Sequence, residues 1–323
     1  MPKFLNCDCL PVDADSRTLP PWRAHYPFAS HEATVGGQWR MHYVDECPAE
    51  PTADDAPTML FVHGNPTWSF HWRRLIAEFA ADYRCVAPDH IGCGLSQKPA
   101  ASFRLADRID HLVELIDQLD LQQVTLVAQD WGGAIGLGAL LRRRERFRGV
   151  LLLNTGAFRP WFIPWRIRVC RTPLLGRLAL QGGNLFSLAA LRMTTNRRPL
   201  PKDIAQAYLA PHDCWEHRRA VYDFVEDIPL SAAHPTWQTL GQIEDALPSL
   251  AHLPINMVWG MQDWCFTPEC LRKFQAAWPH ANARELPDAG HWVLEDAPEE
   301  VAAALRSLLK HSAATQTTPE LAE

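Results

Sequence analysis

The sequence predicts an α/β protein, with a mostly parallel central sheet, helices on both faces and a helical cap inserted between two strands. Two observations lead to this prediction. Short apolar segments typical of buried parallel strands alternate with amphipathic segments typical of helices. The alternation stops over residues 157–235, which are helical in pattern and contain no convincing strand, and resumes in "LPINMVWGMQD" (253–263).

The core elements are expected in the following order. The segment "EATVGGQWRMHYVDE" (32–46) alternates around two glycines and predicts an antiparallel hairpin. Six strands should follow, at Thr58–Val62, Arg84–Pro88, Val124–Ala128, Val150–Leu153, Ile255–Trp259 and Ala283–Leu286. The chain then divides into an amino-terminal extension expected to lie over the surface (1–31), a first core part (32–156), the cap (157–235), a second core part (236–312) and a flexible tail (313–323).

The composition excludes several functional classes. The chain has 323 residues, 47% hydrophobic and 21% charged, which is ordinary for a globular protein with a sizeable core. A net charge of −6 gives no reason to expect nucleic acid binding. We find no signal peptide, no apolar run of membrane-spanning length, no metal-ligand spacing among the nine cysteines and no nucleotide-binding glycine motif. We therefore expect a cytoplasmic protein without metal or cofactor.

One strand is followed by an unusual turn. Residues 124–128 form the predicted strand, "DWGG" (130–133) comes next, and a run of small residues then opens a helix. Strand, sharp turn and small-residue helix are the context of a nucleophile elbow, whose tip residue projects into a cleft. The tip residue is Asp130, where such turns commonly carry a serine. Asp130 is therefore the predicted nucleophile.

Three further segments fall where predicted strands end, the edge at which open α/β sheets place their sites. They are "HGNP" (63–66), Asp263 in "WGMQDW" and His291 in "DAGHWVLED". Together with Asp130, Asp263 and His291 follow the chain order of nucleophile, acid and histidine that is typical of the α/β-hydrolase fold. The sequence therefore predicts this fold, with Asp130, Asp263 and His291 as its catalytic triad.

Each of these residues also has a purely structural interpretation. Asp130 and Asp263 could be N-caps of the helices that follow them, since aspartate commonly caps helices. His291 could be a core histidine with satisfied hydrogen bonds, and Asn65 a turn residue before a proline. Catalysis is favoured because the three occur together, and because the loop 154–158 offers no other carboxylate for the histidine.

An aspartate nucleophile selects a different chemistry from serine. Because it is an anion at neutral pH, it can attack a saturated carbon directly, forming an alkyl ester and releasing an anionic leaving group. The side-chain amide of Asn65 and the indole N–H of Trp131 are the expected donors to that anion. His291, held by Asp263, could then activate water against the ester, whose oxyanion would meet backbone N–H groups near Trp131 and Asn65.

The motifs "HGNPTWSFHWR", "QDWGG", "WGMQDWCF" and "GHWVLED" resemble the haloalkane dehalogenases, over about residues 26–309. The resemblance implies these roles: nucleophile for Asp130, base for His291, acid for Asp263, and halide donors for Asn65 and Trp131.

Three segments are similar to one branch of these enzymes, the β-lactone decarboxylases of bacterial long-chain olefin biosynthesis. They are "AYLAPHDCWEHR" (207–218), "VEDIPLS" (225–231) and "WGMQDWCF" (259–266). This resemblance implies conversion of a cis-3,4-dialkyl β-lactone to a cis-alkene and carbon dioxide, with a carboxylate leaving group that Asn65 and Trp131 could receive in place of halide. Haloalkane dehalogenation remains the alternative, since the catalytic residues do not separate the two reactions.

Two other functions rank lower. Epoxide hydrolases also use an aspartate nucleophile, but they need acids to protonate the opening ring, usually two cap tyrosines. The predicted cap contains Tyr208 and Tyr222, while Asn65 favours an anion pocket. Non-catalytic proteins of this fold would be expected to lack a nucleophile, base or acid, and this chain has a candidate for each.

The cap has an unusual charge pattern. Residues 159–198 contain eight arginines and no Asp or Glu, interleaved with Trp, Ile and Leu. In one interpretation the apolar face lines a pocket for a hydrophobic small-molecule substrate while the arginines remain in solvent. In the other the segment is a docking surface for a membrane or for the acidic face of a pathway enzyme. Substrate chain length, oligomeric state and pathway partners stay open.

Overall fold

The computed structural model describes residues 20–48, 57–172 and 174–316. One eight-stranded sheet forms the centre, in the order β1-β2-β4-β3-β5-β6-β7-β8. Strands β3 to β8 pair in parallel, and β1 and β2 form an antiparallel edge. The bounds are β1 His31–Val35, β2 Trp39–Glu46, β3 Thr58–Val62, β4 Arg84–Pro88, β5 Val124–Asp130, β6 Phe147–Thr155, β7 Ile255–Gly260 and β8 Asn282–Leu286. The predicted, mostly parallel sheet is confirmed.

The strands agree closely with the sequence pattern, although β6 begins three residues before and ends two residues after the predicted strand Val150–Leu153. The predicted hairpin is present, and its turn uses Gly36 and Gly37 at φ of 57° and 71°, a conformation that favours glycine. Strand β5 continues two residues beyond the predicted end at Ala128 to include Asp130. Because Gln129 and Asp130 are polar, the hydropathy pattern ends at Ala128, although every residue of β5 is buried.

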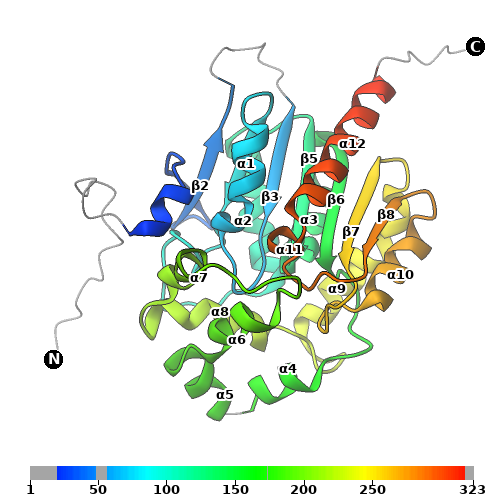
Figure 1. Cartoon of the computed structure of the whole chain (residues 1–323). Helices are drawn as coiled ribbons and strands as arrows, with labels where there is room; N and C mark the ends of the chain where they lie inside the picture. Colours follow the sequence, from blue (N-terminus) through cyan, green and yellow to red (C-terminus); the bar gives the residue numbers. More distant parts are fainter. Residues whose placement is uncertain (1–19, 49–56, 173, 317–323) are drawn as a thin grey trace, which may run out of the picture.

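Helices cover both faces of the sheet (Figure 1). One face carries α1 (Arg73–Phe79), α11 (Val293–Asp296) and α12 (Pro298–Gln316). The other carries α2 (Leu105–Gln118), α3 (Trp131–Arg142), α9 (Pro235–Ala246) and α10 (Pro268–Ala277). Helix α2 is an example of how these helices pack on the sheet. Its apolar residues recur at helical spacing and form one buried stripe, made of Leu105, Ile109, Leu112 and Ile116.

The cap crosses the carboxyl ends of the parallel strands (Figure 1). It consists of α4 (Trp165–Cys170), α5 (Leu175–Arg177), a π-helical turn (Leu178–Gly182), α6 (Leu185–Met193), α7 (Lys202–Leu209) and α8 (Arg219–Glu226). In the described part of residues 157–234 there is no strand, in agreement with the sequence pattern. Pro164, Pro201 and the pair Gly182-Gly183 lie at helix ends and keep these helices short.

The two ends of the chain differ from expectation in their described parts. The extension was expected to lie over the surface, but Trp22, Tyr26 and Phe28 are buried. The rings of Trp22 and Tyr26 lie 5.8 and 5.1 Å from that of Trp68, so this segment is a structural part of the aromatic core. At the other end, α12 extends through Gln316, four residues into the expected tail. Residues 1–19 and 317–323 lie outside the described residues.

Among the described helices, none has the length and apolar character needed to cross a bilayer.

Candidate active site

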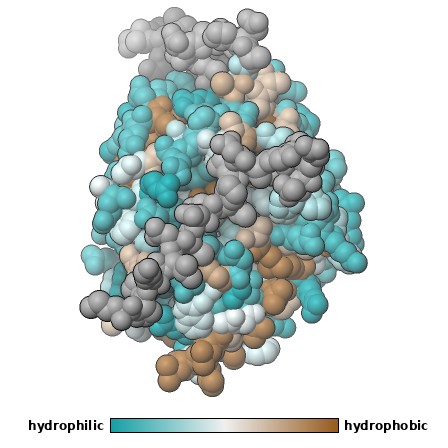
Figure 2. Space-filling model, turned by 90° about the vertical axis from the view of Figure 1, so that its left-hand side faces the viewer, coloured by the Kyte–Doolittle hydropathy of each residue, from teal (hydrophilic) through white to brown (hydrophobic). Residues whose placement is uncertain are grey.

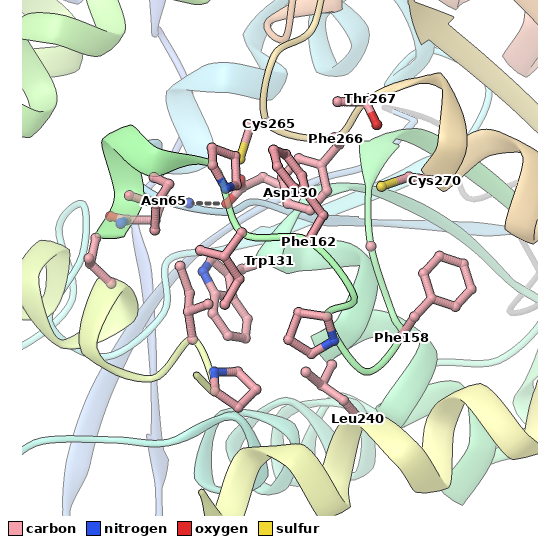
Figure 3. A pocket seen from close by; sticks show the side chains of 18 of the residues that line it. Asn65, Asp130, Trp131, Phe158, Phe162, Leu240, Cys265, Phe266, Thr267 and Cys270 are labelled. Carbon is pink, nitrogen blue, oxygen red and sulfur yellow. Dashed lines mark hydrogen bonds between the residues drawn. The ribbon is translucent and has the colours of Figure 1, made fainter. Parts of the chain in front are cut away.

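Asp130 lies at the tip of a sharp turn between β5 and α3. Its backbone has φ 53° and ψ −133°, a strained conformation for a residue with a side chain, of the kind that clusters at functional sites. Gly132 permits the turn, because a Cβ atom there would meet the carbonyl oxygen of Val62 at 2.0 Å. The Asp130 side chain makes no helix-capping hydrogen bond. It projects into a cavity instead, so the alternative interpretation as an N-cap does not hold (Figure 3).

His291 lies between two carboxylates. Its Nδ1–H donates to Oδ2 of Asp263 at 2.7 Å, and its Nε2 lies 3.5 Å from Oδ2 of Asp130. The ring of Phe266 stacks on the imidazole, with the ring centroids 5.6 Å apart. The structure thus brings the three predicted triad residues together, from the ends of β5 and β7 and from the loop after β8.

Asp263 is held by hydrogen bonds that leave it no capping role. Its Oδ1 accepts the backbone N–H of Cys265 at 2.7 Å, and its Oδ2 accepts from the Asn154 side-chain amide at 3.0 Å in addition to His291. Helix α10 begins at Pro268 with Thr267 as its N-cap residue. The carboxylate is therefore fixed toward the histidine.

The two carboxylates control the charge of the histidine. Burial by itself would lower the pKa of His291, but Asp263 and Asp130 oppose it through charge and hydrogen bonding and raise the pKa from 6.5 to about 10. At neutral pH the resting site therefore holds an imidazolium between two acidic side chains.

Asn65 contacts the predicted nucleophile, Asp130, through its backbone. Its N–H donates to Oδ1 of Asp130 at 2.7 Å (Figure 3). One N–H of its side-chain amide donates to the carbonyl of Val221, in α8 of the cap, at 3.1 Å. An amide nitrogen carries two donors, so the second remains for a ligand. The interpretation of Asn65 as a simple turn residue is thus too narrow, although it does precede Pro66.

Trp131 follows Asp130 directly in the chain and lines the same cavity. Within the described residues its indole N–H has no hydrogen-bond partner, while its ring packs against Phe224 with centroids 5.7 Å apart. This N–H and the second amide N–H of Asn65 are the two donors available beside Asp130 for an anion.

Asn154, at the end of β6, was not identified from the sequence. Its side chain bonds both backbone groups of Gly260, at 2.8 and 3.0 Å, and donates to Asp263. It therefore links the ends of β6 and β7 and orients the acid. A polar residue directly after a strand predicted to be buried is the sequence signal that could have identified it.

Two apolar cavities meet at Asp130 and Asn65. The first has a volume of about 950 Å³ including its open mouth, and extends toward Phe158, Trp161 and Leu240. The second, about 1210 Å³ measured in the same way, extends beneath α4, α5 and α6 toward Leu175 and Met193. Asp130, Asn65, Ile167, Phe186 and Cys265 line both. The site is thus the junction of two apolar arms.

A buried hydrogen-bonded chain connects the cap to the histidine. Arg73 forms a bidentate ion pair with Glu295 at 2.6 and 3.0 Å, and the hydroxyl of Tyr208 in α7 also donates to Glu295 at 2.6 Å. Tyr208 bonds His71 at 2.7 Å, His71 bonds Gln129, and Gln129 donates to the backbone carbonyl of His291. The loop that carries His291 is therefore held in place by buried polar side chains.

The cap tyrosines do not face the reacting groups. Tyr208 is occupied by the chain just described, and neither it nor Tyr222 lines either of the two cavities at Asp130. The pair of acids that epoxide opening requires is not supplied by these side chains.

Comparison with known proteins agrees with the geometry. Residues 57–298 match the family described as alpha/beta hydrolase fold. The chain is 38% identical over 304 residues to the cis-3-alkyl-4-alkyloxetan-2-one decarboxylase of Shewanella oneidensis, covering 91% of this chain and 92% of that protein. It is 34% identical over 291 residues to haloalkane dehalogenase 2 of Mycobacterium tuberculosis, covering 87% and 94%.

Solved structures give the same result for the fold. The haloalkane dehalogenase DbeA from Bradyrhizobium elkani has a TM-score of 0.80 and 29% identity, with 89% of this chain and 99% of that chain covered. The resemblances stated from the sequence motifs, and the fold class predicted from the order of the motifs, are thus confirmed.

Proposed function

Because the chain belongs to the α/β-hydrolase family and is an enzyme of this fold, we propose that it converts a cis-3,4-dialkyl β-lactone to a cis-alkene and carbon dioxide, with Asp130 as nucleophile. The observation that carries the proposal is the junction of two apolar cavities at Asp130. A disubstituted β-lactone has two hydrocarbon chains on adjacent ring carbons, and each chain can occupy one cavity while the ring lies at the junction. The decarboxylase similarity supports the same substrate class.

The shape and lining of the cavities favour a substrate with two hydrocarbon chains. Both cavities are lined mostly by apolar side chains, and they extend from Asp130 in different directions. Two alkyl chains would bury their surface in both cavities, whereas a haloalkane of a few carbons would occupy only the region beside Asp130.

The first step is a displacement at carbon. An oxygen of Asp130 attacks the ring carbon that bears the ring oxygen, the C–O bond of the ring breaks, and its electron pair leaves as a carboxylate. The free N–H groups of Asn65 and Trp131 receive that carboxylate. The backbone N–H of Asn65 bonds the other oxygen of Asp130 and holds the nucleophile in place.

The second step releases both products. The bond between the carboxylate carbon and its ring carbon breaks, its electrons form the alkene, and the C–O bond to Asp130 breaks to return the aspartate anion. No water and no external oxidant or reductant are needed. Inversion in the first step and anti elimination in the second preserve the cis geometry of the ring substituents.

His291 has a role in this scheme as an acid rather than a base. As an imidazolium it can donate to the departing Asp130 carboxylate across the 3.5 Å separation and so favour its expulsion. In a water-dependent reaction it would have to lose its proton. Esterification removes the charge of Asp130, which is one of the groups that raise the pKa of His291. His291 therefore loses its proton more easily only after the displacement.

The second candidate is a haloalkane dehalogenase. Both donors beside Asp130 would suit a halide equally well, and the fold neighbours carry that name. Epoxide hydrolysis ranks third because the cap tyrosines are turned away from the cavities.

Purified protein incubated with a cis-3,4-dialkyl β-lactone, with hydrocarbon analysed by gas chromatography, tests the proposal. We expect the wild type to form cis-alkene and carbon dioxide in equimolar amounts, and Asp130→Ala to form no alkene. An intact lactone together with bromide release from a bromoalkane would replace the proposal by the dehalogenase.

The remaining expectations from the sequence accompany this proposal. The reaction as written needs no metal or cofactor, and the protein acts in the cytoplasm. Support for a reducing compartment comes from the seven described cysteines, all of which are free.

A further inference from the structure

Exposed apolar side chains are concentrated on one side of the cap. Of the eleven large hydrophobic side chains that are exposed in the described part of the chain, ten lie between residues 161 and 193. We call this the rim surface; its members are Trp161, Phe162, Trp165, Val169, Leu174, Leu175, Leu178, Leu185, Leu188 and Met193. Trp165 is 67% exposed and Leu175 68%, values far from those of core residues. Figure 2 shows hydrophobic surface gathered at the tip of the molecule where α4 and α5 lie in Figure 1.

The charge on the same surface has one sign. Arg166, Arg168, Arg177 and Arg192 are exposed on α4, α5 and α6. In the described part of the chain none of these four forms an ion pair, whereas other cap arginines do, as with Arg159 and the residues Glu244 and Asp245. The segment itself supplies no carboxylate from 159 to 198. Unpaired arginines among exposed aromatic and aliphatic side chains are the composition that binds anionic lipid surfaces.

Both cavities reach this surface. Trp161 and Phe162 line the first cavity, and Val169, Leu175 and Met193 line the second. These five side chains are also members of the rim surface, so the hydrocarbon-lined interior and the exposed apolar surface are continuous.

We propose that the rim surface rests on an anionic lipid bilayer, and that a hydrocarbon ligand passes from the membrane directly into the cavities at Asp130. The arginines contact lipid headgroups while the apolar side chains reach the acyl region. The contact is peripheral, in keeping with the absence of a spanning helix among the described residues. It does not depend on which electrophile Asp130 attacks.

A protein partner fits the surface less well than a bilayer. The exposed side chains project from several short helices around the mouths of the cavities. A protein covering them would close both mouths, whereas a bilayer is itself the phase in which a water-insoluble ligand dissolves. A second copy of this chain on the same surface is the competing occupant, and the experiment separates the two.

Vesicle flotation with the full chain tests the proposal. Vesicles of phosphatidylcholine with phosphatidylglycerol should bind the protein, vesicles of phosphatidylcholine alone should bind it at least about tenfold more weakly, and added salt should weaken the binding further. The apolar variant Trp165→Ser/Leu178→Ser and the charge variant Arg168→Gln/Arg192→Gln should each lower affinity about tenfold or more. None of these four residues lines a cavity.

The matched control is Arg144→Gln. It removes an exposed positive charge from the 3-10 turn Arg144–Arg146, which leads into the amino end of β6, and should bind vesicles like the wild type. Binding by both rim variants at wild-type strength, or failure of the wild type to bind either vesicle, would overturn the proposal. So would a dimer that the rim variants dissociate, detected by light scattering, because a second copy would then occupy the surface.

Turnover of a detergent-dispersed short-chain substrate should be unchanged in the rim variants. This measurement shows that they are folded, and it separates a failure of membrane docking from a failure of the proposed reaction.

Discussion

The Nε2 atom of His291 lies 3.5 Å from Oδ2 of Asp130, while its Nδ1 lies 2.7 Å from Oδ2 of Asp263. The histidine is thus paired with the proposed nucleophile, Asp130, as well as with the proposed acid, Asp263. A serine in the elbow would be neutral and would raise the pKa of the histidine less. The raised pKa of His291 is therefore due to both carboxylates, with the charge of Asp263 as the largest cause of the increase and the aspartate at the tip of the elbow adding to it.

The stability of the protein should depend on pH through His291. Its pKa is raised from 6.5 to about 10 in the folded protein. The folded chain therefore holds the proton more tightly than the unfolded chain, and this contribution to stability is complete below about pH 6.5 and lost as the pH approaches 10. We expect Tm to fall across this range by a larger amount in the wild type than in His291→Gln, measured by circular dichroism. If Tm fell by the same amount with pH in the two proteins, the raised pKa of His291 would be contradicted.

Trp131→Phe should lower kcat by about 10²-fold with a smaller effect on KM, since it removes one donor to the leaving group and keeps the ring. Steady-state kinetics with the β-lactone or the bromoalkane would measure it. Trp165→Phe is the matched control, because that exposed ring does not line a cavity, and it should behave like the wild type. Equal kinetics for the two variants would remove the assigned role of the indole N–H.

Asn154→Ala should destabilise the fold and weaken catalysis together. The change leaves the backbone groups of Gly260 and one acceptor of Asp263 without a partner, at a cost of about 1–3 kcal/mol in the free energy of unfolding. Urea unfolding measures the first effect. Steady-state kinetics measures the second. A change in the His291 titration, followed by NMR, would link the two effects to Asp263, because a purely structural asparagine would leave that titration unchanged.

The two cavities should be separable by substitution. Ala189→Phe narrows the second cavity, and Ile228→Trp narrows the first. Each should lower kcat/KM for a lactone with two long chains by about tenfold or more, and a lactone in which one chain is short should restore it. Since the variants fill different cavities, they should require shortening of different chains. If one shortened chain rescued both variants, the assignment of one chain to each cavity would be wrong.

Arg73→Met should cost about 3–5 kcal/mol in the free energy of unfolding, because it leaves the buried carboxylate of Glu295 without its cation. The double variant Arg73→Met/Glu295→Leu should recover much of this loss, since it removes both charges. Urea unfolding of the two variants checks the difference. Equal losses in both would indicate that packing rather than charge dominates.

The core and the candidate catalytic residues could be predicted from the sequence because both predictions depend on local patterns. Strand periodicity predicts β3 and β4 at their observed bounds, and the sharp turn between β5 and α3 indicates Asp130 without any information on its neighbours in space. His291 and Asp263 followed from their places after strands. What brings such residues together is the parallel sheet, which aligns the carboxyl ends of its strands.

The contacts made across the chain were not accessible. Asn154 has its effect through Gly260 and Asp263, more than a hundred residues later. The contact of Asn65 with Val221 depends on how the cap lies on the core. Short cap helices carry little periodicity, so their register on the core could not be predicted from the sequence. The burial of Trp22 could not be predicted for a similar reason, since an aperiodic segment does not indicate which residues of the core it contacts.

The cap is attached to the core unevenly, and this has a consequence for ligand exchange. On the α7 side, Trp68 donates to the carbonyl of Ala207 and Tyr208 joins the buried ion pair of Arg73 and Glu295. On the α4 and α5 side, the buried apolar contacts form only a small separate cluster around Ile167 and Leu180. Fluctuations should therefore be fastest in α4 and α5, with amide protons that exchange early, while α7 stays protected. The lifetime of a bound hydrocarbon would then be set by the motion of helices that take no part in the chemistry.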